Sequence, residues 1–137
     1  RVTTDAKFFC HVRQVAETVA GGQDEPVYRY FFTEGLETPT LAPFGAFHAI
    51  ELIFVFDYLE AGGYSPEPEE RSLSDAIQSY WGNIAASGDP NDGELPTWDP
   101  YDPGLDNQLV LTGGEIHMEN EIRADRCAFW EDLLGAP

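Results

Sequence analysis

The side chains in this chain best suited to acid–base chemistry are its three histidines, because imidazole ordinarily titrates near neutral pH. His11 falls within a predicted helix and His117 within a predicted hairpin, which are ordinary structural or surface positions. His48 instead follows a predicted strand across a long loop and precedes an apolar segment. It is therefore the candidate for proton transfer, although a loop histidine beside apolar residues can equally be a packed side chain.

A histidine that acts as a general base needs a nucleophile to activate. The sequence has no Gly-x-Ser-x-Gly elbow, since flanking glycines are missing around Ser65, Ser72, Ser74, Ser79 and Ser87. It also lacks a phosphate-binding loop, a dinucleotide fingerprint and zinc-ligand spacing, so we expect neither a metal nor a cofactor. Catalysis through His48 would require a nucleophile from another segment or chain.

The first half of the chain is predicted to place His48 between a strand and a short helix. Apolar periodicity predicts a helix over residues 4–20, which Gly21 and Gly22 end. The short aromatic run 26–32 predicts a strand that is covered on both faces, as in the interior of an α/β sheet. A loop over residues 34–47, rich in Gly and Pro, leads to His48, and a short buried helix is expected over residues 50–59.

The second half is predicted to add a long helix, a loop, a hairpin and a last helix. The long helix starts near Pro66 or Leu73, with Ser65 or Ser72 as its cap, and ends at Ser87 before Gly88. A loop over residues 89–106 follows. Two glycines between the runs 109–111 and 116–118 predict a tight hairpin, and the last helix is expected over residues 121–134, capped by Asn120.

One covered strand and one hairpin cannot complete an α/β sheet. We therefore interpret residues 1–137 as a partial α/β fold, helix-rich, with one core strand and a C-terminal β-hairpin. Such a piece depends on another segment or chain, and alone it is expected to self-associate in order to cover its strand edge. A stand-alone helical interaction domain is less favoured, because it would leave that strand without neighbours.

The net charge of the chain limits the classes of molecule that it is expected to bind. Asp and Glu outnumber Lys and Arg by 25 to 7, which gives a net charge of −18. This charge repels phosphate backbones and argues against nucleic-acid binding. The acidic surface either steers cationic substrates or only keeps the protein in solution. No apolar run approaches the roughly 18 residues of a membrane span, so no transmembrane segment is expected.

Cys10 and Cys127 are the two cysteines, and they lie in predicted helices near opposite ends of the chain. A bridge between them would close a loop that stabilises the fold by about 4–5 kcal/mol in loop-entropy models. Two buried free thiols are equally consistent with the composition.

Five ordered segments carry a family resemblance. Gly45 to Phe56 reads G-A-F-H-A-I-E-L-I-F-V-F and resembles the histidine motif of type-B carboxylesterases and cholinesterases, roughly G-x-x-H-[GA]-x-E-[LI]-x-F-V-F. Four further blocks match in family order, at residues 5–10, 27–32, 80–91 and 126–130. Over essentially its whole length the chain resembles the C-terminal region of a cholinesterase-like α/β-hydrolase.

The resemblance implies roles for particular residues. His48 matches the catalytic base, which in such hydrolases occupies a late loop. Glu51 would support the site through hydrogen bonds, and Phe44 and Phe47 would line the substrate pocket or pack in the core. The two cysteines match a family disulfide, which implies a secreted or extracytoplasmic protein.

The resemblance also implies what this chain lacks. The serine and the triad acid would lie in an N-terminal part of the same hydrolase, which would hydrolyse a small carboxylic ester through an acyl-enzyme. The isolated chain would be inactive. The alternative is a non-catalytic, cholinesterase-like adhesion or interaction domain on the same fold. Three features depart from the family pattern. Ala49 and Asp57 stand where many members have glycine, and the usual Trp-Pro pair has one residue inserted, as Trp98-Asp99-Pro100.

Overall fold

The computed structural model describes residues 4–134, which form two compact units. Residues up to 29, 99–108 and from 119 onward make one unit, here called the disulfide unit. Residues 30–98 and 109–118 make the other, here called the histidine unit. Among the described helices, none is long and apolar enough to cross a membrane.

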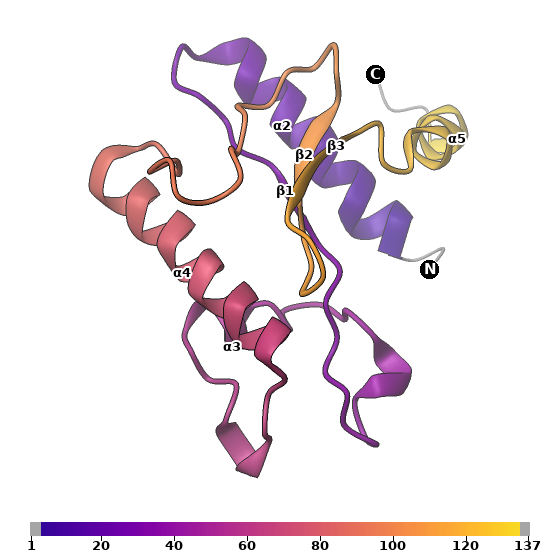
Figure 1. Ribbon diagram of the computed structural model, residues 1–137. Coiled ribbons are helices and arrows are strands. Elements are labelled where there is room, and N and C mark those ends of the chain that lie inside the picture. The colour runs from indigo at the N-terminus through magenta and orange to yellow at the C-terminus, as the bar shows by residue number, and fades with distance from the viewer. Residues whose placement is uncertain (1–3, 135–137) are drawn as a thin grey trace. The chain divides into compact units, whose positions relative to one another are not determined.

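Three strands form one sheet in the order β1-β2-β3 (Figure 1). They are β1 Tyr30–Phe32, β2 Asn107–Leu111 and β3 His117–Asn120. β1 pairs in parallel with β2, so that Tyr30 lies opposite Leu109 and Phe32 opposite Leu111. A parallel pair needs a crossover between its strands, which the helices of the histidine unit supply. The partial α/β fold with a C-terminal hairpin is confirmed.

The burial of the strands differs from the prediction. Every residue of β2 is buried, whereas the three residues of β1 are half-buried. Within the part of the chain that the structure describes, β1 is an edge strand and β2 is the central one. The predicted tight hairpin is also longer than two residues, because residues 112–116 separate β2 from β3.

Two helices fix the segment that follows His48. α3 Leu52–Val55 contacts α4 Pro68–Ser87, whose Leu73, Ile77 and Tyr80 are buried at helical spacing. The Ser74 hydroxyl, which is buried in α4, donates a hydrogen bond of 2.7 Å to the Phe54 carbonyl oxygen. Phe54 is fully buried, so the short helix after His48 is held against a long one.

The start of α4 corrects the prediction of a serine cap. Glu67 is the N-cap residue, Pro68 occupies the first turn, and Glu70 completes a capping box with Glu67. The Glu70 carboxylate also accepts the Tyr64 hydroxyl at 2.8 Å, which keeps this buried acid hydrogen-bonded. The predicted end at Ser87 is confirmed, because Gly88 adopts the left-handed conformation with φ 82°.

A cluster of aromatic rings packs β1 against α4 and the loop over residues 89–106. Trp98 is buried, and its ring centroid lies 5.5 Å from that of Tyr80 and 5.6 Å from that of Trp81. Tyr30 adds an edge contact of 5.2 Å to Trp81. Asn91 fixes Trp98, because its side chain accepts the Trp98 N–H at 2.7 Å and donates to the Trp98 carbonyl oxygen.

In the disulfide unit, a π-helical segment Asp5–Phe9 continues into α2 Cys10–Gly22, and α5 Ala124–Leu134 ends the described chain. Cys10 and Cys127 form a disulfide, and both are buried. α5 starts later than expected, because Glu121 and Arg123 have positive φ values of 56° and 59° that interrupt a helix.

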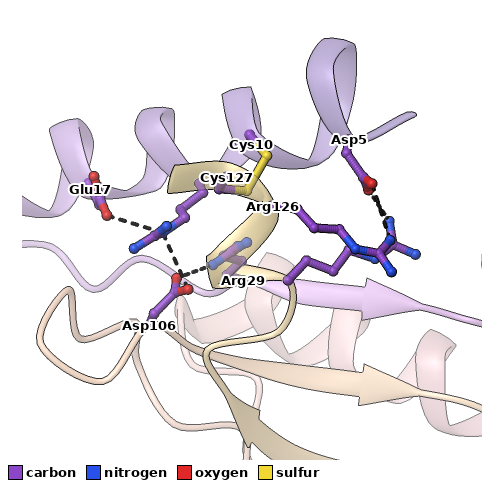
Figure 2. The surroundings of a disulfide bond; sticks show 9 residues. Asp5, Cys10, Glu17, Arg29, Asp106, Arg126 and Cys127 are labelled. Carbon is purple, nitrogen blue, oxygen red and sulfur yellow. Dashed lines mark hydrogen bonds and ion pairs between the residues drawn. A yellow bond between two sulfur atoms is a disulfide. The ribbon is translucent and has the colours of Figure 1, made fainter. Parts of the chain in front are cut away.

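Ion pairs accompany this disulfide (Figure 2). Asp5 is buried and pairs with Arg123 at 2.7 Å and with Arg126 at 3.2 Å. Asp106, which is also buried, pairs with Arg29 and with Arg13. The buried carboxylates of this unit are therefore each matched by two guanidinium groups, as buried charges require.

Removing the disulfide should destabilise the chain strongly. The bond closes a sequence separation of 117 residues. Combining Cys10→Ser with Cys127→Ser should lower the free energy of unfolding by about 2–5 kcal/mol, because the unfolded chain regains entropy. Urea unfolding measures this difference. Reductant should lower the urea midpoint of the wild-type chain and leave that of the double variant unchanged. Equal urea midpoints for the two chains in the absence of reductant would contradict the prediction.

Stability should fall at high pH in part through Tyr80. Burial, and then the charge of Asp92, raise the pKa of Tyr80 to about 12. An unfolded tyrosine titrates near pH 10, so above that pH the unfolded chain loses a proton that the folded chain keeps, and stability falls as pH rises. Urea unfolding between pH 8 and 11 should show a shallower fall for Tyr80→Phe. At pH 8 the free energy of unfolding of this variant should be lower by about 1 kcal/mol, because it lacks the hydrogen bond from the Tyr80 hydroxyl to the Pro96 carbonyl oxygen.

Candidate functional site

The loop that carries His48 leaves the sheet where the parallel strands β1 and β2 end. The Thr33 N–H extends their pairing by one hydrogen bond of 3.0 Å to the Leu111 carbonyl oxygen. Glu34 then accepts the Gly113 N–H at 2.6 Å through its side chain. In open α/β sheets, ligands bind beyond the carboxyl ends of the strands. The histidine loop therefore starts at the edge of the sheet where a site is expected.

His48 lies in a tight turn. The Ile50 N–H donates to the Phe47 carbonyl oxygen at 3.1 Å, and Ala49, the third residue of the turn, has φ 68°. A positive φ at this position is the feature of a type II turn, which favours glycine there. Ile50 is buried while His48 is exposed, so the turn anchors one neighbour and presents the imidazole to its surroundings.

The predicted neighbours of His48 have different environments. Glu51 is half-buried, and after burial its charge is the second cause that raises the pKa of Tyr30. Phe44 and Phe47 are 68% and 38% exposed, and their ring centroids lie 6.4 Å apart in an edge-to-face contact. Within this chain Phe44 lies at the surface, and both alternatives for it, pocket lining and core packing, stay predictions.

The remaining polar candidates have structural surroundings. His11 is exposed on α2, and the His117 ring lies 3.1 Å from the Glu115 carbonyl oxygen through Nδ1. Ser74 is buried and bonded to the backbone of Phe54, which is a packing role. Among residues 4–134, no three His, Cys, Asp or Glu side chains gather in a way that could hold a metal ion.

A model of the carboxylesterase family matches residues 1–130 of this chain. The chain belongs to the carboxylesterase family. Its similarity to acetylcholinesterase from Gallus gallus is 36% identity over 111 residues, or 79% of this chain. It is similar to liver carboxylesterase from Sus scrofa at 36% identity over 64% of this chain, and to bile salt-activated lipase from Homo sapiens at 30% identity over 85%.

These matches cover only a small part of each relative. The aligned segment spans 14% of the acetylcholinesterase, 15% of the liver carboxylesterase and 16% of the bile salt-activated lipase. The family and the partial fold thus agree that this chain corresponds to a piece of the relatives it resembles.

Two of the three departures from the family pattern, Ala49 and Asp57, fall at positions with positive φ. Ala49 has φ 68° and Asp57 has φ 53°, in the left-handed region where glycine carries no steric cost. Asp tolerates this conformation better than most residues, whereas Ala has no polar group to compensate it. The glycines that many family members carry at these two positions therefore have a conformational reason.

Some residues that hold this site carry no motif of their own. The sequence pattern places Glu34 only in a loop. In the structure its carboxylate joins the end of β1 to the hairpin by accepting hydrogen bonds from the Thr112 hydroxyl and the Gly113 N–H. An acidic residue directly after a strand and before a glycine is a weak signal. Its partners lie 78 and 79 residues away in sequence, and a single sequence does not reveal them.

Replacing Ala49 should test the strain in the turn of His48. Ala49→Gly should raise the free energy of unfolding by about 0.5–1 kcal/mol, the net of relieved left-handed strain and added chain entropy. Ala49→Val should lower it by about 1–2 kcal/mol, because β-branched residues disfavour positive φ. Urea unfolding checks both.

Ala46→Gly serves as the control, since φ of Ala46 is not positive. It should only lose stability, by up to about 1 kcal/mol. Destabilisation by Ala49→Gly equal to that of the control would contradict the proposed strain.

Proposed function

We propose that this chain is the C-terminal part of a serine carboxylic-ester hydrolase and that His48 is its general base. The observation that carries the proposal is the place of His48. It is exposed in a turn whose loop starts beyond the carboxyl ends of two parallel strands, where α/β sheets bind ligands. The family match over residues 1–130 supports the same assignment.

In the proposed reaction, His48 accepts the proton of a serine hydroxyl as that oxygen attacks the ester carbonyl carbon. The imidazolium then donates this proton to the leaving alcohol, and the acyl-enzyme is hydrolysed by water through the same base. The serine, the triad acid and the oxyanion donors come from the N-terminal part of the hydrolase. Glu51 supports the site from the turn that follows His48, and Phe44 with Phe47 lines the substrate pocket.

Exposed apolar side chains on the disulfide unit support the proposal that another segment of the hydrolase packs against it. Phe8, Val12 and Val15 lie at helical spacing along the first helix and are 49%, 53% and 61% exposed. A row of large exposed apolar side chains indicates an interaction surface. We propose that the N-terminal part of the hydrolase covers it, and that the isolated chain self-associates to hide it.

The disulfide supports a location outside the reducing cytoplasm. Stable disulfides form in secreted and extracytoplasmic proteins, where glutathione and thioredoxin do not keep thiols reduced. Cys10 and Cys127 are both buried in their bond. We therefore propose that the protein is secreted or extracytoplasmic.

The proposed roles are tested by p-nitrophenyl ester hydrolysis. The isolated chain should show no turnover, because it has no nucleophile elbow. In the longer hydrolase that carries this segment, His48→Ala should lower kcat by about four orders of magnitude or more. His117→Ala, a matched loss of an imidazole, should leave kcat within about twofold.

Turnover by the isolated chain that His48→Ala abolishes would contradict the dependence on an N-terminal serine. Full activity of the longer His48→Ala enzyme would refute the role of His48. A longer protein that hydrolyses no ester at all would favour the adhesion or interaction alternative.

A further inference from the structure

We propose that Glu34, Gly35 and Gly45 are positioning residues that close the base of the histidine loop and thereby set the place of His48. The histidine loop is defined here as residues 34–48. The inference rests on the proposed function of His48. It concerns residues of the histidine unit alone. Gly45 begins the histidine motif, whereas Glu34 and Gly35 belong to none of the five family segments.

The two glycines bring the ends of the loop together. A Cβ atom added to Gly35 would lie 3.1 Å from the Cα and carbonyl carbon of Gly45. Contacts this short are rare for real Cβ atoms, and the atoms that would be struck are backbone, which cannot rotate away. Gly45 itself has φ 57° and ψ −144°, a conformation that side chains disfavour. A side chain at Gly35 would therefore push Gly45 away by a few tenths of an ångström, whereas one at Gly45 would meet open space but strain the backbone.

Glu34 ties the start of the loop to the hairpin. Its Oε2 atom accepts the Gly113 N–H at 2.6 Å and the Thr112 hydroxyl at 3.3 Å. A Cβ atom added to Gly113 would lie 3.1 Å from the same Oε2 atom, so a side chain there would displace the Glu34 carboxylate by a few tenths of an ångström. A charge-assisted hydrogen bond to a backbone N–H is stronger than a neutral one, so this contact holds the residue next to Gly35 in place.

The following residues add a second anchor on α4. Leu36 is buried, and the backbone of Glu37 lies near the Tyr64 hydroxyl, whose pKa it lowers against the larger raising effects of burial and Glu70. Tyr64 in turn donates to the Glu70 carboxylate in the first turn of α4. The entry of the histidine loop is thus fixed to two elements that pack independently of it.

Only Ala46 and Phe47 separate Gly45 from His48. On the other side of His48, Ile50 is buried and Phe54 is held by Ser74. A shift of Gly45 therefore reaches His48 through only two residues, while the chain after His48 is held by buried Ile50. Proton transfer is sensitive to such a shift, since misplacing a reacting group by about 1 Å can cost about 100-fold in rate.

The experiment measures ester hydrolysis by the longer hydrolase that carries this chain. Gly35→Ala should lower kcat by about 10-fold or more, because the base moves. KM should change by a smaller factor, because Phe44 and Phe47 in the same loop are only part of the proposed substrate contacts. Gly82→Ala is the matched control, since nothing lies within 4 Å of a Cβ atom added there. It should leave kcat and KM near those of the parent.

A second pair guards against misfolding of Gly35→Ala. Gly113→Ala crowds Glu34, whereas Gly114→Ala meets nothing within 4 Å, so only the first should lower kcat. Glu34→Ala should also lower kcat, and Glu34→Gln should restore much of it, because the amide oxygen still accepts the Gly113 N–H.

The outcomes separate the two proposals. Full activity of His48→Ala would refute the proposed function itself. If His48→Ala is inactive while Gly35→Ala and Gly113→Ala match their controls in kcat, the positioning role is overturned and the proposed function stands. A lower melting temperature with unchanged kcat would likewise assign these residues to stability alone and overturn the inference.

Discussion

The parallel pairing of β1 with β2 is the contact on which the placement of the candidate site depends. With Tyr30 opposite Leu109 and Phe32 opposite Leu111, the two strands end together, and the chain after β1 emerges beside the chain after β2. This register brings the Glu34 carboxylate to the backbone of Gly113. A slip of one residue would turn the side chains of β1 to the opposite face and remove the aromatic contacts of Tyr30 and Phe32.

The charged residues of this acidic chain form ion pairs within the protein and leave a negative charge on its surface. Among residues 4–134, five arginines form ion pairs with carboxylates: Arg13, Arg29, Arg71, Arg123 and Arg126. Four of them lie in the disulfide unit, where buried Asp5 and Asp106 would otherwise be unpaired charges. Because the cations are committed to these internal pairs, much of the negative charge remains for the surface.

Local rules predicted several elements of the fold, and departures from them occur near the site. The stop of α4 at Gly88 followed from its sequence, because glycine adopts the left-handed conformation without steric cost. The long helix after His48, the loop that carries Trp98 and the hairpin were also recognisable. Ala49 and Asp57 break the rule that positive φ belongs to glycine and lie within nine residues of His48, while Asp106, Glu121 and Arg123 break it in the disulfide unit. Strained backbone is commonly found at functional sites, where the surrounding packing holds it in place.

The sequence by itself determined the family, the order of the elements and the loop that carries His48, because these depend on ordered blocks and on preferences of neighbouring residues. The tertiary structure alone decided that β2 rather than β1 is the buried strand, and that Glu67 and Glu70 cap α4 in place of a serine. It also decided that Gly35 meets Gly45 and that Glu34 meets Gly113. Each of these outcomes depends on contacts with segments that are distant in sequence or on the closure of a loop. Such contacts form only when the whole chain packs, and no local pattern records them.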